Sequence, residues 1–383
     1  MHNAQIMSQS RSQERLPARQ VVPGRVSVII PAYNAAATVE RTIASVLNQS
    51  YTNLEVLVVD DGSTDETAAL VQQMVDVAGR IRLLQKPNGG LVSARNHGIA
   101  HATGEFIAPV DADDLWHPQK IAKQVALMRK RGDQVGLIYT WGRGIDEDDR
   151  ILKDLRTYRF RGDVYAALIV RGFVGSGAPL VRRRCVDEVG GYDASLSVRG
   201  ATCCEDFKFS LDIAERCHFD LVPEFLWGYR FRSGSMSTHL ENMVRSHELV
   251  LRDVRPRHPE LPSKLFRWGR ADQYMEYALY HLRDARFWQA GQLFLKALRD
   301  DPPGTLLSGV RQVAARLERA RSLGMSAIDG DEDAIFGRKF LEVDPTVFGG
   351  RPRRQLSHRR MAYVSEIQVQ AVATPRLSAC DRM

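Results

Sequence analysis

Three apolar segments in the first third of the chain end in polar residues. They are VSVIIPAYN (26–34), LEVLVVDDGS (54–63) and EFIAPVDADD (105–114). In an open parallel sheet, ligands bind outside the carboxyl ends of the strands, so the polar residues at three such ends are predicted to meet in one pocket. These residues are Pro31, Tyr33, Asn34, Asp61, Asp111 and Asp113.

The aspartates at these ends favour a cation or a polar ligand. Carboxylates that crowd together repel each other unless a cation or hydrogen-bond donors compensate their charge. Asp111 and Asp113 are two residues apart, so they share a face in an extended chain. The pattern predicts a site for a metal-bound, phosphate-bearing molecule. The structural alternative is that these residues form turns and helix caps, as Ser63 and Glu66 would in a capping box.

The first 140 residues alternate between apolar strands and amphipathic helices. Helices are expected after Thr38, through 70–75, at Ser93–Ala102 and at Ile121–Arg131, with a further strand around 81–83. Strand–helix units that alternate in this way predict an α/β fold with a doubly wound, mostly parallel sheet.

The chain beyond residue 140 changes character twice. Residues 141–240 are irregular in pattern, with one clear helix at Asp206–Arg216. Helices are then expected at Leu240–Val254, Trp268–Leu282 and Phe287–Leu298, the last two spaced like one tetratricopeptide unit. Because a single such unit cannot bury its own apolar face, the hairpin is predicted to pack on the α/β core.

Five segments, in this order along the chain, resemble family 2 inverting glycosyltransferases, which have the glycosyltransferase A-type fold. They are VSVIIPAYNAAATVERTIASVLNQSY, LEVLVVDDGSTDET, NGGLVSARNHGIAHATGEFIAPVDADD, GGYDASLSVRGATCCEDFKFSLDIAE and YRFRSGSMS. The resemblance implies transfer of a sugar from a nucleotide-sugar donor, with UDP the first expectation. The implied acceptor is a hydroxyl of a glycan, a lipid-linked molecule or another compound, and the implied cofactor is Mg²⁺ or Mn²⁺.

The resemblance also implies roles for the residues at the strand ends. Asp61 would contact the nucleotide base with Tyr33 packed nearby, and Asp111 would contact the ribose or donor sugar close to Arg95. Asp113 would bind the metal. The implied nucleotide-sugar-binding residues are Pro31, Tyr33, Asn34, Asp61, Arg95, Asp111 and Arg232.

EDFKFSLDIA resembles the acidic segment at the acceptor site of the family. There the second acid, Asp206, is implied as the general base, next to Glu205. Acids are common at any helix N-terminus, so the pair alone does not indicate catalysis. Two departures stand out: Lys208 occupies a position where relatives often have an acid, which puts the acceptor preference in doubt, and Arg232 replaces a common histidine. An arginine can pair with a diphosphate but cannot coordinate a metal.

These expectations divide the chain into parts. They are a disordered N-terminus (1–24), a catalytic domain (25–238) with a nucleotide-binding half (25–140) and an acceptor half (141–238), a helical region with the hairpin (239–344), and a flexible basic tail (345–383).

The composition fits a soluble enzyme with a net charge of +7. No segment approaches the roughly 20 apolar residues of a membrane span, and the N-terminus lacks a secretory signal. The basic residues follow no nucleic-acid-binding pattern. Two explanations of the positive charge stay open: a solvated basic face, or contact with an anionic membrane surface or a polyanionic acceptor. The five cysteines show no CxxC spacing, which predicts a reduced, cytoplasmic protein, with Cys203 and Cys204 as buried thiols.

Two other functions are compatible with parts of this pattern. A sugar-nucleotide nucleotidyltransferase also uses carboxylates and a metal, but it should have a glycine- and basic-rich phosphate loop near the first strand, which PAYNAAA does not supply. A catalytically silent scaffold that binds partners through the C-terminal helices should have lost the acidic site residues, and all of them are present.

Overall fold

The computed structural model describes residues 20–155, 157–232, 239–309 and 335–349, with residues 360, 363, 364, 366 and 367. The strands are β1 (Val22–Ala32), β2 (Leu54–Asp60), β3 (Ile81–Gln85), β4 (Gly104–Pro109), β5 (Leu115–Trp116), β6 (Val135–Ile145), β7 (Ile151–Leu155), β8 (Leu180–Arg182) and β9 (His218–Arg230). The α-helices are α2 (Val39–Leu47), α3 (Thr67–Ala78), α4 (Leu91–His101), α5 (Lys120–Arg131), α6 (Tyr165–Val170), α7 (Arg183–Val189), α8 (Ser195–Val198), α9 (Glu205–Ala214), α10 (Leu240–Val254), α11 (Ser263–Arg283) and α12 (Phe287–Asp300). Short 3₁₀ helices are η1 (Gly132–Gln134), η3 (Arg255–Arg257) and η4 (Phe340–Glu342).

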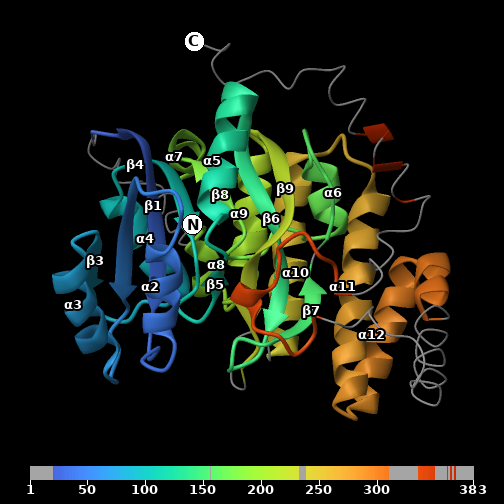
Figure 1. The fold of residues 1–383 in the computed structure, drawn as a ribbon. Helices are drawn as coiled ribbons and strands as arrows, with labels where there is room; N and C mark the ends of the chain where they lie inside the picture. The colour runs from blue at the N-terminus through green and yellow to red at the C-terminus, as the bar shows by residue number, and fades with distance from the viewer. Residues whose placement is uncertain are drawn as a thin grey trace, which may run out of the picture.

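One sheet connects the two halves of the α/β region. Its strand order is β3-β2-β1-β4-β8-β6-β9-β5, with β7 paired to β6. The first four strands in this order are mutually parallel, whereas β8 pairs in antiparallel fashion with both β4 and β6. The predicted α/β fold is therefore confirmed, with a parallel half formed by β1 to β4 and a mixed half formed by β5 to β9, and Figure 1 shows the C-terminal helices beside the mixed half.

The region 141–240 is more regular than its sequence pattern predicted. It contains β7, β8 and β9, the end of β6, and three short helices before α9. The prediction missed these elements because β6 is buried at all eleven positions and β8 has only three residues. A strand that is buried on both faces shows no polar–apolar alternation in its sequence.

The start of α3 corrects the predicted capping box. Helix α3 begins at Thr67, and the carboxylate of Asp65 accepts hydrogen bonds from the Thr67 backbone N–H at 3.0 Å and from its hydroxyl at 2.5 Å. The backbone N–H of Ser63 instead donates to the Asp60 carboxylate at 3.1 Å. Asp65 therefore accepts the hydrogen bonds at the start of α3, in place of the predicted capping box of Ser63 and Glu66. Ser63 lies too far upstream of Thr67, the first residue of the helix, to cap it.

The C-terminal helices pack on the α/β core at α6, as predicted for the hairpin. Helix α11 lies against α6, and Arg171 at the end of α6 forms ion pairs with Asp272 and Glu276 of α11. Helix α12 packs against α11, so that α11 separates α12 from α6. Figure 1 shows α11 and α12 in orange, side by side.

The chain near residue 345 is folded against the sheet. The backbone N–H of Phe225 in β9 donates to the Pro345 carbonyl at 2.8 Å, and the ring of Phe348 contacts the rings of Trp141 and Phe225. The predicted boundary of a flexible tail at 345 is therefore too early. Similarly β1 begins at Val22, inside the predicted disordered N-terminus. Residues 1–19 and most of 350–383 lie outside the described residues, so these parts of the two predictions stay untested.

Two glycines in neighbouring helices should respond oppositely to alanine. A Cβ at Gly269 in α11 would lie 2.1 Å from the backbone oxygen of Ile169 in α6, whereas a Cβ at Gly291 in α12 meets nothing within 4 Å. We expect Gly269→Ala to lower the free energy of unfolding by about 1–3 kcal/mol because α11 must move away from α6. Gly291→Ala, the matched control, should raise it by about 0.5–1 kcal/mol. Urea unfolding checks both, and equal effects would contradict the close packing of α11 on α6.

Candidate active site

The parallel register brings the predicted strand ends to one edge. Ala32 at the end of β1 pairs with Asp60 of β2, which pairs in turn with Gln85 of β3. On the other side of β1, Ile29 pairs with Pro109, the last residue of β4. The segments that follow β1, β2 and β4 therefore leave the sheet side by side, as the sequence predicted.

The three predicted residues at the end of β1 occupy different environments. Pro31 is buried inside the strand, so it shapes β1 rather than presenting a side chain at its end. Tyr33 is 53% exposed, which leaves its ring open to a ligand. Asn34 has a positive φ of 49° and accepts a hydrogen bond from the Thr64 backbone N–H at 2.8 Å. Asn34 thus joins the loops after β1 and β2.

Asp61 is buried and holds the loop that precedes α4. Its carboxylate accepts hydrogen bonds from the backbone N–H groups of Gly89 and Gly90, at 3.0 and 2.7 Å, and pairs with the Lys86 ammonium at 2.5 Å. The role of Lys86 was missed from sequence, although its position directly after β3 is the same strand-end signal that singled out Asp61. Both residues belong to the edge where the strand ends meet.

Arg95 of α4 joins the segment after β4 to the start of α9. It is only 1% exposed, and its two terminal nitrogens donate to Asp111 at 2.5 Å and to Glu205 at 2.7 Å. Its guanidinium also lies 5.1 Å from the ring centroid of Tyr192. One buried cation therefore binds two predicted site acids that are far apart in the sequence.

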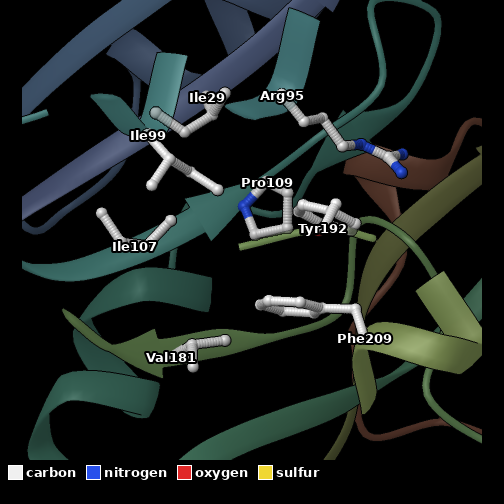
Figure 2. A pocket seen from close by; sticks show the side chains of 8 residues that line it. All are labelled: Ile29, Arg95, Ile99, Ile107, Pro109, Val181, Tyr192 and Phe209. Carbon is white, nitrogen blue, oxygen red and sulfur yellow. The ribbon is translucent and has the colours of Figure 1, made fainter. Parts of the chain in front are cut away.

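The apolar seam beside Arg95 is a packing contact between the two halves. Figure 2 shows the aliphatic and aromatic side chains that line it, with Arg95 at its rim. The seam has no room for a water molecule, so it positions Arg95 and does not bind a substrate. The other lining residues are Ile29, Ile99, Ile107, Pro109, Val181, Tyr192 and Phe209.

Asp113 carries an incompletely compensated negative charge. Burial and the neighbouring Asp111 charge raise the pKa of Asp113 to about 6, while Arg232, with a nitrogen 3.7 Å away, acts in the opposite direction. Arg232 also lies 3.4 Å from the Thr38 hydroxyl. The rest of the segment YRFRSGSMS, residues 233–237, lies outside the described residues.

Hydrogen bonds from β9 fix the position of the segment around Asp113. Asp114 is fully buried and accepts hydrogen bonds from the Trp227 indole at 2.8 Å and from the Arg230 backbone N–H at 3.0 Å. Arg230 donates in turn to the backbone oxygen of Asp113 at 2.7 Å. Burial, together with the charges of Asp113 and Asp111, raises the pKa of Asp114 well above its usual range. These positioning contacts were missed because they cross from β4 to β9.

Glu205 and Asp206 are adjacent in α9 but differ in their contacts. Glu205 is buried and paired with Arg95. Asp206 is half-buried, and one of its oxygens accepts a hydrogen bond from the Phe207 backbone N–H at 2.7 Å. Within the described part of the chain, no cation pairs with Asp206. Of the two acids, Asp206 is therefore the one with a carboxylate oxygen open to another molecule.

Lys208, the departure from the family pattern, is neutralised inside the fold. It is buried and pairs with Asp212 one turn later, and its nitrogen lies 3.7 Å from Asp193. Its charge is therefore compensated by carboxylates of the fold.

The cysteines correct the prediction of a fully reduced protein. Cys185 of α7 and Cys217, just after α9, form a disulfide. Their 32-residue separation has no motif spacing, so only the fold brings them together. Cys203 and Cys204 are buried and form no disulfide among the described residues, which agrees with the prediction of buried thiols, and burial raises the pKa of Cys203 to about 11. Cys380 lies outside the described residues. With a disulfide present, the cysteines no longer support the predicted cytoplasmic location.

The site fits a divalent cation bound by one protein carboxylate. The described residues contain no group of three His, Cys, Asp or Glu side chains arranged to hold a metal. Mg²⁺ typically keeps several waters and binds through one or two carboxylates plus substrate phosphates. Because the charge of Asp113 is only partly offset by Arg232, its carboxylate suits such an ion when phosphates complete the coordination.

Comparison with known proteins agrees with this geometry. Residues 27–190 match the family described as Glycosyl transferase family 2. The chain carries a glycosyltransferase family 2 domain. This domain contains β1 to β4 and the strand ends described above. An uncharacterised glycosyltransferase of Rickettsia bellii is 36% identical over 153 residues, which is 40% of this chain and 22% of that protein. The chain thus spans about a fifth of that relative's length.

Solved structures share the fold of the glycosyltransferase domain. Residues 1–349 of S. aureus TarS, in complex with UDP-GlcNAc, superpose with a TM-score of 0.53 at 17% identity, covering 73% of this chain and 83% of that one. The mannosyltransferase PcManGT of Pyrobaculum calidifontis, in complex with GDP-Man and Mn²⁺, gives 0.51 at 20% identity, covering 78% and 82%. At these identities the likeness concerns the glycosyltransferase A-type fold. Among the residues described, none of the helices has the length and apolarity to cross a membrane.

The pKa of Glu205 predicts how the stability of the glycosyltransferase domain depends on pH. Burial and the Asp206 charge raise it from 4.5 to about 7, against the influence of Arg95. The folded state therefore binds a proton more tightly at Glu205, and this contribution to stability is lost as the pH rises from 4.5 to 7. The Glu205→Gln variant lacks this proton-linked contribution. The free energy of unfolding of wild type minus that of the variant should therefore fall between pH 4.5 and pH 7. Urea unfolding at about pH 5 and about pH 8 measures this difference, and a constant value would contradict the raised pKa.

Proposed function

We propose that the chain is an inverting glycosyltransferase in which Asp206 acts as the general base. The observation that carries this proposal is the contrast between the two acids of α9. Glu205 is occupied by Arg95, whereas Asp206 has an oxygen free of partners within the described residues. Because Arg95 also binds Asp111, the acids of α9 lie next to the strand ends that would bind the donor.

The donor in this proposal is a nucleotide sugar, with UDP the first nucleotide to test. The exposed ring of Tyr33 would pack near the base, beside the loop that Asp61 fixes to Gly89 and Gly90. Asp111 is 23% exposed, so it can reach a ribose or sugar hydroxyl while one oxygen stays on Arg95. The TarS complex with UDP-GlcNAc supports UDP, and the PcManGT complex with GDP-Man keeps GDP as the main alternative.

Asp113 would hold Mg²⁺ or Mn²⁺ in the presence of the donor diphosphate. When bound, such an ion stabilises the negative charge that accumulates on a leaving diphosphate. Arg232 lies 3.7 Å from the same carboxylate and supplies a second positive charge next to the proposed diphosphate position. It would pair with phosphate oxygens while Asp113 binds the ion.

The proposed reaction is a single displacement. Asp206 takes the proton of an acceptor hydroxyl, and the hydroxyl oxygen forms a bond to the anomeric carbon. The bond from that carbon to the donor phosphate breaks on the opposite face, and the nucleoside diphosphate leaves with the electron pair. Attack from the face opposite the leaving group inverts the anomeric configuration. The acceptor in this proposal is a hydroxyl of a glycan or of a lipid-linked molecule. The proposal also includes peripheral contact of this basic chain with an anionic membrane surface.

A panel of sugar nucleotides tests the proposal without knowledge of the acceptor. We expect slow hydrolysis of one donor, dependent on Mn²⁺ or Mg²⁺, and calorimetry should show tighter binding of its nucleoside diphosphate with metal than without. Asp113→Asn should remove this metal dependence. Equal affinity for UDP, GDP and dTDP with and without metal would contradict the role of Asp113, and absence of hydrolysis of any donor by the intact chain would count against the activity.

A further inference from the structure

A groove between α10, α11 and α12 has a strongly basic lining. Its volume is about 420 Å³, and none of the residues that line it belongs to the candidate active site. Five cationic side chains line it: Arg252 of α10, Arg255 of η3, Arg270 of α11, and Lys296 and Arg299 of α12. The groove exists only because three helices and a 3₁₀ turn meet there, so it is a property of the tertiary structure.

The acids in the groove do not balance these cations. Two carboxylates, Glu248 and Asp300, line it against five cations, which leaves a net charge of +3 (5 − 2). Asp300 already binds Arg270, with contacts of 2.7 and 2.9 Å. Glu248 accepts a hydrogen bond from the Tyr274 hydroxyl at 2.6 Å and lies 3.5 Å from Lys296. The two acids are therefore occupied by groups on other walls of the same groove.

Three of the cations have no carboxylate partner among the described residues. In the described parts of the chain, no Asp or Glu oxygen lies within ion-pair distance of Arg252, Arg255 or Arg299, and the Arg255 guanidinium lies 5.2 Å from the centroid of the Phe266 ring. Phe266 and Leu251 form an apolar, buried part of the wall. Apolar walls strengthen the field of nearby charges because they reduce the dielectric response around them.

Helix ends alone do not account for this charge. Arg252 and Arg299 lie in the last turns of α10 and α12, where cations are favoured by the helix dipole. Each helix C-terminus carries roughly half a negative elementary charge, so two of them offset about one of the three excess positive charges. The groove keeps a net positive charge after this correction.

We propose that the groove binds a multiply charged, phosphate-bearing anion. The planar guanidinium of arginine presents paired N–H donors that match phosphate geometry, and four of the five cations here are arginines. The volume lies within the range of small-ligand sites, about 300–1,000 Å³. The phosphates belong either to a soluble molecule or to a lipid headgroup, and the same groove chemistry serves both.

Calorimetry with inorganic pyrophosphate in EDTA tests the site in the full-length chain. Arg252→Gln and Arg299→Gln should each weaken this binding by about ten-fold or more, since hydrogen bonds to charged groups are the strong ones. The double variant should show the larger loss and should hydrolyse the sugar donor at the wild-type rate. Arg283→Gln is the matched control: the Arg283 side chain is 70% exposed at the far end of α11 and pairs with neighbouring Asp284 and the Tyr280 ring, outside the groove, so binding should be unchanged.

A second arm identifies the source of the phosphate. Phosphatidylglycerol vesicles should retain wild-type protein better than the double variant if the groove binds lipid headgroups, with phosphatidylcholine vesicles as the uncharged reference. A loss seen with pyrophosphate alone assigns a soluble ligand. The proposal is overturned if the double variant equals wild type in both arms. A pure helix-dipole role predicts that outcome, with only a change in unfolding free energy. Donor hydrolysis is scored separately, so failure here leaves the proposed transferase activity intact.

Discussion

Asp206→Asn should lower sugar transfer by about 10²–10⁴ while donor affinity stays nearly unchanged. This corresponds to about 3–5 kcal/mol of transition-state stabilisation at 1.36 kcal/mol per decade. The asparagine keeps the shape of the side chain and can still accept the hydrogen bond from the Phe207 N–H, but it cannot take a proton. The measurements are kcat for transfer to an acceptor and the Kd of the nucleoside diphosphate.

Two neighbouring substitutions serve as controls for this prediction. Glu205→Gln retains an oxygen that can accept from Arg95, so its effect on kcat should be milder than that of Asp206→Asn. Asp113→Asn should weaken donor binding and transfer together, because it removes the proposed metal ligand. If Glu205→Gln abolishes transfer while Asp206→Asn leaves it at the parent rate, Glu205 is the base and the assignment is wrong.

Arg95→Met should lower the free energy of unfolding by about 3–5 kcal/mol, the usual cost of breaking a buried ion pair from one side. Arg95 is the shared partner of Asp111 and Glu205, and the substitution leaves the buried Glu205 carboxyl without its cation. Because Arg95 lowers the pKa of Glu205, its loss forces this carboxyl either to take up a proton or to stay buried as an uncompensated charge. Urea unfolding at neutral pH measures the change. Transfer should fall as well, because the loop that carries Asp111 and the start of α9 lose their common contact.

A second-site change separates the charge effect from lost packing. In the Arg95→Met background, Glu205→Gln removes the carboxyl that has lost its cation and should restore part of the lost stability, more at about pH 8 than at about pH 5. Arg82→Met is the matched control, since Arg82 is exposed and makes a single long hydrogen bond to the His101 carbonyl at 3.3 Å. It should change stability by no more than about 0.5 kcal/mol. Equal stability of Arg95→Met and wild type would show that the ion pairs do not hold the two halves together.

The sequence by itself determined the parallel half of the fold and the edge where the site forms. The run Leu54–Asp60 is buried along its whole length, as its apolar pattern predicted. Of the apolar stripe at helical spacing that predicted α2, Val39, Ile43 and Val46 are buried and Leu47 is partly buried. Strand and helix periodicity are local properties, and parallel pairing aligns all carboxyl ends. The positions of Asp61, Asp111 and Asp113 at one edge therefore follow from the order of the strands and helices.

Only the tertiary structure decided which of these groups contact each other. Arg95 meets Glu205 across 110 residues, and Cys185 meets Cys217 across 32, with no sequence signal for either pair. The same is true of the basic groove, whose cations come from three helices and a turn. Such contacts depend on how the helices pack on the sheet, and this packing is determined by many side chains at once. A residue pattern along the chain records which side chains are available, and the packed fold sets the distances that turn two acids of α9 into one paired group and one open group.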